Sequence, residues 1–258
     1  MQSDQIFKTS ADANAANLHD YDAEYADFSW DAARKLIDGL PGGGVNIAYE
    51  AIERHVLAGH GPQIALRWIS KSGERTDITY AELSRLTNRF ANVLRSCGLK
   101  KGARIYSLLG RTPELYIAAL GSLKAGCIFC PLFSAFGPEP IHARMEIGGA
   151  NALITTTRLY KRKISDLRDR LPELQTVLLT DGDVEGGDPL PPLMAEASDA
   201  FETERMKPED TALLHFTSGT TGKPKGVVHV HDAVVAHHIT GKLALDLKIL
   251  MARWRGGA

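Results

Sequence analysis

Cysteine is scarce in this sequence: Cys97, Cys127 and Cys130 are the three that occur in 258 residues. Three cysteines, an odd and small number for a chain of this length, argue against a disulfide framework. The second Cys pair that a zinc site would need is missing. Cys127 and Cys130 have the spacing of a redox pair. However, Ile128 and Phe129 between them are typical of a buried strand, whereas a redox pair normally opens a helix. We therefore expect inert core thiols.

Net charge and long apolar runs are also lacking. Thirty Lys and Arg against thirty-one Asp and Glu leave a formal charge of -1, so no global field attracts nucleic acid or an anionic membrane. The acidic N-terminus has neither the basic start nor the apolar run of a secretory signal. The richest apolar stretch, Leu115 to Phe133, is interrupted by Lys124 and Pro131, which argues against a membrane span. This pattern is typical of a soluble cytoplasmic protein that holds any anion locally.

Strand-like and helix-like segments alternate along the chain, and 44% of its residues are hydrophobic. Candidate strands cover residues 64–70, 104–109, 127–132, 152–155, 176–179, 211–216 and 226–230. Candidate helices cover residues 79–97, 112–126, a segment from about 138, 161–170 and 233–247, and a Gly-, Asp- and Pro-rich loop covers 181–192. This alternation predicts an α/β fold with largely parallel sheets flanked by helices.

One segment between two candidate strands has the composition of a polyphosphate cradle. It consists of Thr217, Ser218, Gly219, Thr220, Thr221, Gly222, Lys223, Pro224, Lys225 and Gly226. Its three glycines allow close backbone approach, so that successive N–H groups can point into one concave anion site. Four hydroxyls add donors to phosphate oxygens, and the two lysines add point charges.

Two other interpretations of this segment were weighed. The nucleotide loop of kinases and GTPases has four residues between its glycines and Ser or Thr after its lysine, whereas here two residues separate Gly219 from Gly222 and Pro224 follows Lys223. A flexible Gly- and Thr-rich hairpin loop with solvated lysines is the simpler alternative. Ten consecutive residues suited to one task, between two apolar strands, favour phosphate binding.

Residues 217–226 resemble the signature phosphate loop of the acyl-adenylate-forming superfamily, the AMP-dependent synthetases and ligases. Five further segments are similar to its acetate–CoA ligase branch: Phe28–Trp30, Asn46–Glu50, Arg89–Asn92, Pro113–Tyr116 and Pro131–Glu139. The resemblance implies a two-step reaction. A carboxylate and ATP give an acyl-adenylate and pyrophosphate, and coenzyme A then displaces AMP to give a thioester.

The resemblance also implies ATP, Mg²⁺ and coenzyme A as substrates and cofactor, with small molecules as partners. The ATP phosphates would bind at Thr217, Ser218, Gly219, Thr220, Thr221, Gly222, Lys223, Lys225 and Gly226. Coenzyme A would contact Phe136, Gly137, Pro138, Lys161, Arg162 and Lys163, together with Arg158; for the basic residues, however, a solvated helix face is the favoured interpretation. No catalytic residue is assigned, and no metal site is expected from the nearby His229, His231, His237 and His238.

By this resemblance we expect three parts: an N-terminal extension (1–44), a partial AMP-binding domain (45–247) and an aberrant tail (248–258). Related ligases place the adenine and acyl pockets well after the loop, but only thirty-two residues follow Gly226 here. We therefore expect a truncated or frame-shifted product that does not make acyl-CoA alone. A longer-chain acyl-CoA ligase, an amino-acid adenylation domain and a non-catalytic nucleotide-binding remnant remain as alternatives.

Overall fold

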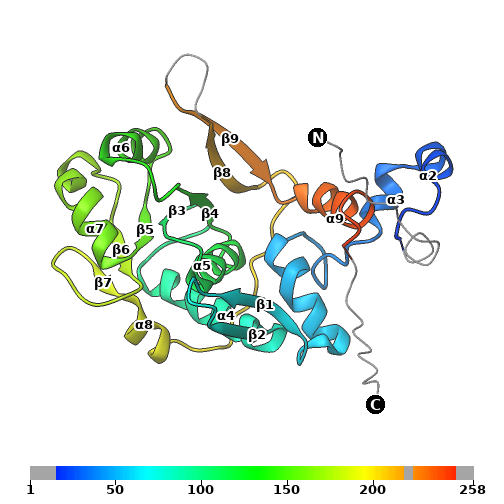
Figure 1. Cartoon of the computed structure of the whole chain (residues 1–258), viewed down its shortest axis with the longest axis horizontal. Coiled ribbons are helices and arrows are strands. Elements are labelled where there is room, and N and C mark those ends of the chain that lie inside the picture. The colour runs from blue at the N-terminus through cyan, green and yellow to red at the C-terminus, as the bar shows by residue number, and fades with distance from the viewer. Residues whose placement is uncertain (1–15, 218–222, 248–258) are drawn as a thin grey trace, which may run out of the picture. The chain divides into compact units, whose positions relative to one another are not determined.

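The structure is a computed structural model that describes residues 16–217 and 223–247 (Figure 1). The chain divides into two compact units. One contains the described parts of residues 1–38 and 233–258, and the other contains residues 39–232 with the same restriction. The three-part division expected from the sequence stays a prediction.

A seven-stranded sheet in the order β7-β6-β5-β3-β4-β8-β9 forms the centre of the larger unit (Figure 1). Its strands are β3 (Arg104–Leu108), β4 (Ile128–Pro131), β5 (Ala152–Thr155), β6 (Thr176–Leu179), β7 (Asp188–Pro189), β8 (Thr211–Thr217) and β9 (Lys225–Val230). All neighbouring strands are parallel except β8 and β9, which are antiparallel. The expected α/β fold with a largely parallel sheet is confirmed.

Helices cover both faces of this sheet. Helices α4 (Tyr80–Ser96), α5 (Pro113–Lys124) and α8 (Leu190–Glu196) contribute to one hydrophobic cluster, and α6 (Pro138–Ile147), α7 (Thr157–Lys163) and the 3₁₀ helix η3 (Ser165–Arg170) contribute to the other. Successive residues of β3 alternate between them: Ile105 joins the first cluster and Tyr106 the second. Because both faces are buried, the strands read as apolar runs, and each large side chain contributes about 1.5–3 kcal/mol.

A two-stranded antiparallel sheet precedes α4, made of β1 (Ile64–Ile69) and β2 (Arg75–Thr79). Its turn includes Gly73 at a φ of 88°, a left-handed conformation that glycine adopts without strain. The Thr79 side chain accepts a hydrogen bond of 3.2 Å from the Glu82 N–H, so the predicted helix start is confirmed. Two π-helical turns, η1 (Tyr49–Glu53) and η2 (Val56–His60), lie before β1.

Two expected segments differ in the structure. The helix expected over 161–170 begins at Thr157, where the side-chain oxygen of Thr156 accepts a hydrogen bond from the Leu159 N–H. It ends at Lys163, because the φ of -123° at the next residue, Ile164, is not helical. The remainder is the 3₁₀ helix η3. The loop expected over 181–192 contains β7 and the start of α8, because β7 pairs with the end of β6. Tertiary pairing, which composition does not reveal, recruits this short edge strand.

The smaller unit contains α2 (Tyr21–Asp27), α3 (Trp30–Arg34) and α9 (Ala233–Leu243). Ala33, Val235 and Ile239 form its small buried cluster. Helix α9 ends four residues before the expected Leu247. Within the two described ranges, every helix is too short or too polar to cross a bilayer.

Candidate functional site

The β8–β9 hairpin presents both ends of the predicted phosphate loop. Thr217 lies opposite Lys225 in the pair next to the connecting segment, and Phe216 lies opposite Gly226. The Thr217 hydroxyl lies 3.5 Å from the carbonyl oxygen of Lys225. Antiparallel pairing therefore brings both ends of the predicted phosphate-binding segment together at the end of β8. Residues 218–222, which include Ser218, Gly219, Thr220, Thr221 and Gly222, lie outside the described residues.

The described loop residues can attract an anion. Thr217, Lys223, Lys225 and Gly226 are all exposed. Neither lysine ammonium forms an ion pair within the part of the chain that the structure describes. Two unneutralised ammonium groups close to a hydroxyl suit a polyanion such as a triphosphate, because Lys is a common phosphate-binding point charge. No group of three or more His, Cys, Asp or Glu side chains among the described residues is arranged to hold a metal ion.

Strand direction brings the other predicted ligand contacts to the same edge of the sheet. Strand β8 runs parallel to β4 through the pair Phe129 and Leu213, so Thr217 and Pro131 both lie at carboxyl ends. Phe136, Gly137 and Pro138 follow β4, and α7 follows β5. Ligands of open α/β sheets bind at this edge. Three strand spacings separate β5 from β8, about 14 Å, which is long enough to place two parts of an extended ligand.

Lys163 is held by the backbone of the segment that follows β4. Its ammonium donates to the carbonyl oxygens of Ser134 and Phe136, at 2.6 Å each. The guanidinium of Arg144 lies 4.3 Å from the centre of the Phe136 ring, a cation–π contact. Lys163 and Arg144 therefore fix the shape of this segment.

Lys161 and Arg162 differ from Lys163 in their surroundings. Both are exposed on the last turn of α7, as is Arg158 near its start. The side chains of Lys161 and Arg162 form no hydrogen bond or ion pair with the described residues. Of the basic residues predicted to contact coenzyme A, Lys161 and Arg162 are thus free to bind an anionic group, whereas the ammonium of Lys163 already donates to two carbonyl oxygens.

Comparison with known proteins identifies the family. The family model described as AMP-binding enzyme matches residues 53–251. The chain belongs to the AMP-binding enzyme family. An acetyl-coenzyme A synthetase of Bacillus subtilis is 38% identical over 90% of this chain, and one of Halorhodospira halophila is 32% identical over 78%. The predicted resemblance to the acetate–CoA ligase branch of the adenylate-forming superfamily is confirmed.

Solved structures of AMP-binding enzymes share the fold. An acyl-CoA synthetase of Brucella canis superposes with a TM-score of 0.77 at 30% identity, covering 86% of this chain and 40% of its own. An anthranilate CoA ligase in complex with anthranoyl-AMP, at 22% identity and a TM-score of 0.67, shares the fold. The chain spans 41% and 33% of the lengths of the two synthetases of B. subtilis and H. halophila.

His231, at the end of the hairpin, has a structural role that its sequence context did not reveal. Its side chain is fully buried, and its Nδ1 accepts a hydrogen bond of 3.2 Å from the Ile47 N–H. The proton therefore lies on Nε2, which has no hydrogen-bond partner among the described residues. Burial lowers the pKa of His231 to about 4. The neutral imidazole links the end of β9 to the segment before η1.

His215 and His229 form a second feature of the hairpin, since their rings meet edge to face at 5.5 Å. Burial, and then the charge of His229, lowers the pKa of His215.

Cys127 and Cys130 are buried, as expected, and burial raises the pKa of each thiol to about 12. Such thiols carry almost no thiolate at neutral pH, so they are poor nucleophiles and poor metal ligands. The prediction of a core location is confirmed for this pair, whereas Cys97 is only partly buried; the chemical inertness of the three thiols stays a prediction.

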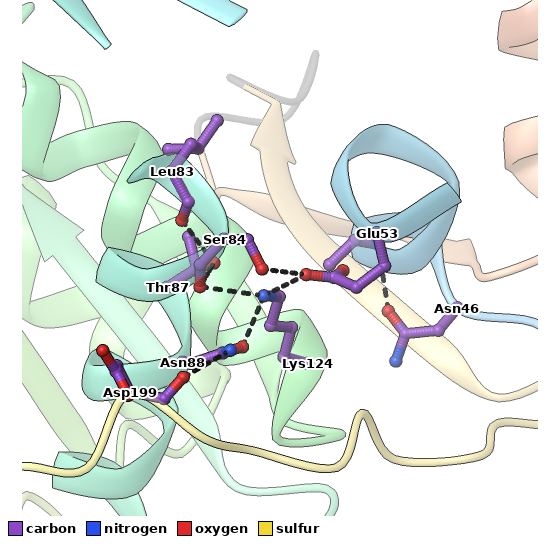
Figure 2. A network of polar contacts seen from close by, with 9 residues as sticks. Asn46, Glu53, Leu83, Ser84, Thr87, Asn88, Lys124 and Asp199 are labelled. Carbon is purple, nitrogen blue, oxygen red and sulfur yellow. Dashed lines mark hydrogen bonds and ion pairs between the residues drawn. The ribbon is translucent and has the colours of Figure 1, made fainter. Parts of the chain in front are cut away.

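A buried polar network, which sequence analysis missed, joins α4, α5 and η1 (Figure 2). The fully buried ammonium of Lys124 forms an ion pair with Glu53 and donates to the Asn88 side-chain oxygen at 2.6 Å and to the Ser84 carbonyl oxygen at 3.2 Å. The Ser84 hydroxyl donates to Glu53 at 2.8 Å. The available signal was a single lysine within an apolar stretch. This network fixes the helical layer under one face of the sheet.

Proposed function

We propose that this chain binds the triphosphate of ATP at residues 217–226 and contributes the phosphate-binding part of an AMP-forming acid–thiol ligase. The observation that carries the proposal is the pairing of Thr217 with Lys225, which brings these two residues together at the carboxyl end of β8. Family membership supports ATP as the nucleotide. The two exposed lysines at the end of the loop supply charge complementary to the phosphates.

In the proposed reaction the carboxylate oxygen attacks the α-phosphorus of ATP, and the bond to pyrophosphate breaks. Negative charge then develops on the leaving pyrophosphate. The ammonium groups of Lys223 and Lys225, the Thr217 hydroxyl and the loop N–H groups would stabilise that charge, which is electrostatic catalysis without a side-chain nucleophile. Mg²⁺ is the proposed companion of ATP, because it is commonly bound through substrate phosphates.

Coenzyme A is the proposed acceptor, with its phosphates near Lys161 and Arg162. These cations lie at the same sheet edge as the phosphate loop, and both are exposed and unpaired among the described residues. In the proposal, Phe136, Gly137 and Pro138 line the approach, and Lys163 holds that segment in place through its carbonyl oxygens.

A short-chain carboxylic acid is the proposed substrate. The relatives at 30% identity or above include acetyl-coenzyme A synthetases and a 3-hydroxypropionyl-coenzyme A synthetase of Metallosphaera sedula, which is 34% identical over 73% of this chain. Acetate and 3-hydroxypropionate are both small acids, which favours a small acyl group here over a long chain or an amino acid.

A crossed calorimetric experiment tests the two binding sites. Lys223→Ala is expected to weaken binding of ATP with Mg²⁺ about tenfold, because a charge-assisted hydrogen bond contributes about 1.5–3 kcal/mol. It should leave coenzyme A binding unchanged. Lys161→Ala combined with Arg162→Ala should do the reverse. Lys71→Ala, an exposed lysine in the β1–β2 turn, is the matched control and should alter neither. An unchanged ATP affinity for Lys223→Ala would remove the phosphate role of that lysine.

We further propose that this chain alone does not complete the reaction, because it spans 41% of the length of the B. subtilis relative. Acetate-dependent pyrophosphate release by the purified protein is expected to stay at background even where calorimetry detects ATP. Turnover at ordinary enzyme rates, about 1–1000 per second, would contradict this part and leave the binding proposal intact.

A further inference from the structure

Arg144, on helix α6, is a buried cation that lacks an acidic partner in the described part of the chain. Of the lysines and arginines that the structure describes, Lys124 and Arg144 are the two that are buried, and Arg144 is 8% exposed. Lys124 has the Glu53 carboxylate as its counter-ion. No Asp or Glu within residues 16–217 and 223–247 forms an ion pair with Arg144. A buried charge without a counter-ion is costly to the fold, so its presence calls for a function.

The hydrogen bonds of the Arg144 guanidinium leave one of its sides unoccupied. Nη1 donates to the Pro140 carbonyl oxygen at 2.7 Å. Nε is buried and has no hydrogen-bond partner among the described residues, and Nη2 forms no hydrogen bond with them either. Nε and Nη2 together form the side of a guanidinium that can bind a carboxylate or a phosphate through two parallel N–H donors. The side that suits an anion is therefore the side that the chain leaves without an acceptor.

Arg67 shows the same side of a guanidinium when it is occupied. Its Nε donates to Oδ1 of Asp77 at 2.7 Å, and its Nη2 donates to Oδ2 at 3.1 Å. Two further arginines, Arg89 and Arg168, also have one buried nitrogen without a partner among the described residues. Both of these residues are half-buried, so water can offset their charge. Arg144 is more deeply buried and needs another source of negative charge.

The Arg144 side chain reaches back to the carboxyl edge of the large sheet. Long side chains of a helix point toward its N-terminus, and the hydrogen bond to Pro140, four residues earlier, shows this direction here. The guanidinium lies 4.3 Å from the centre of the Phe136 ring, in the segment between β4 and α6 (Figure 1). The charge of Arg144 thus lies beside the segment that is predicted to contact coenzyme A.

We propose that Arg144 is a further binding residue at this edge, and that its Nε and Nη2 donate to a phosphate group of a bound ligand. The phosphate would supply the missing counter-ion. Stacking on Phe136 occupies a face of the guanidinium and leaves its in-plane donors available. Arginine can hold a phosphate through two parallel donors, whereas lysine acts as a point charge. This proposal deepens the proposed function and rests on it for the source of the phosphate, which is coenzyme A or ATP.

NMR of the arginine side chains tests the contact directly. The full chain is labelled with ¹⁵N in arginine, and the Nε–H resonance of Arg144 is identified by its loss in Arg144→Lys. Coenzyme A, ATP with Mg²⁺ and inorganic pyrophosphate are added in three separate arms. At least one of them is expected to shift the Arg144 resonance downfield, and the arm that does so identifies the source of the phosphate. The Nε–H resonance of Arg67, which Asp77 already holds, is the internal control and should stay in place.

Calorimetry and urea unfolding distinguish a binding role from a structural one. Arg144→Met should weaken binding of the ligand that shifts the resonance about tenfold, because a charge-assisted contact is lost, and Arg144→Lys should recover part of this loss. Without ligand, the urea midpoint of Arg144→Met should stay within about 0.3 M of the parent value, since no carboxylate loses its partner. Arg54→Met is the matched control. It removes an ion-pair partner of the buried Glu50 carboxylate, so it should lower the midpoint and leave ligand binding unchanged.

An Arg144 resonance that stays in place in all three arms would overturn the proposal, even where calorimetry detects a bound ligand. The same conclusion would follow if Arg144→Met lost stability as Arg54→Met does and kept its ligand affinity, because Arg144 would then be structural. If the parent chain bound neither coenzyme A nor ATP, the proposed function would fail. A shift of the Arg144 resonance by pyrophosphate would in that case still support a phosphate contact at this residue.

Discussion

Replacement of Lys124 by methionine probes the buried network that joins three helical elements (Figure 2). Methionine keeps most of the side-chain volume but removes the ammonium. Three acceptors then lose the ammonium as a donor: the Glu53 carboxylate, which keeps the Ser84 hydroxyl, the Asn88 side-chain oxygen and the Ser84 carbonyl oxygen. The Oε2 atom of Glu53 already has no hydrogen-bond partner among the described residues.

The expected loss of unfolding free energy on Lys124→Met follows from the burial of Lys124 and Glu53. Removing one member of a buried ion pair costs about 3–5 kcal/mol. The Lys124 side chain is fully buried, whereas that of Glu53 keeps 19% exposure, so water can partly solvate the carboxylate left behind. We therefore expect a loss near the lower limit, about 3 kcal/mol. In a protein of this size, that lowers the melting temperature by about 6–12 °C.

Combining Lys124→Met with Glu53→Gln leaves no unpaired charge, so the double variant should be more stable than the single one, with a loss of about 1–2 kcal/mol. Urea unfolding of the four proteins in this double-mutant cycle measures the coupling. A loss below about 1 kcal/mol for Lys124→Met, or simple additivity in the cycle, would refute the reasoning.

The pH dependence gives an independent readout of the same network. Burial lowers the pKa of Lys124 from its ordinary 10.5, more than the Glu53 carboxylate raises it. Between the lowered pKa and 10.5 the unfolded chain binds the proton that the folded chain has lost, so the contribution of Lys124 to stability increases with pH in that window. The Lys124→Met variant should lack this increase.

Two further predictions concern packing and a buried histidine. Gly121→Ala should lower the free energy of unfolding by about 1–2 kcal/mol, measured by urea unfolding, although alanine gains about 1 kcal/mol in helix propensity. The reason is that the added Cβ would lie 2.9 Å from the Thr87 carbonyl oxygen. Gly110→Ala, whose Cβ would meet nothing within 4 Å, is the control, and equal effects of the two substitutions would disprove the close-contact argument. His231→Gln should cost about 1–3 kcal/mol, whereas His231→Asn, whose oxygen can replace Nδ1 as acceptor for the Ile47 N–H, should cost less. The free energy of unfolding of the parent chain should fall as pH drops from 6.5 to about 4, because in this range His231 is protonated only in the unfolded chain. If both His231 variants kept the same dependence of unfolding free energy on pH, this assignment would be contradicted.

Local patterns were sufficient for the main architecture. The alternation of apolar runs and capped helices predicted the parallel sheet, and capping residues such as Thr79 set helix starts. The phosphate-binding role of residues 217–226 stays a prediction, which could be made because the ten residues are contiguous and their composition indicates one chemistry. The family comparison agrees with the resemblance that these residues carry.

Long-range contacts decided what local patterns could not. Lys163 resembles its neighbours Lys161 and Arg162 in sequence, yet only tertiary packing brings its ammonium to carbonyl oxygens 27 and 29 residues away. Lys124 likewise acquires its ion pair from Glu53 on a different helical element.

The sequence by itself therefore determined the class of fold, because periodicity and capping act over a few neighbouring residues, and its loop composition predicted a kind of ligand. The tertiary structure decided which cations are held by backbone oxygens and which strands lie at the edges of the sheet. Both depend on partners distant along the chain, whose approach is set by packing of the whole sheet and its helices.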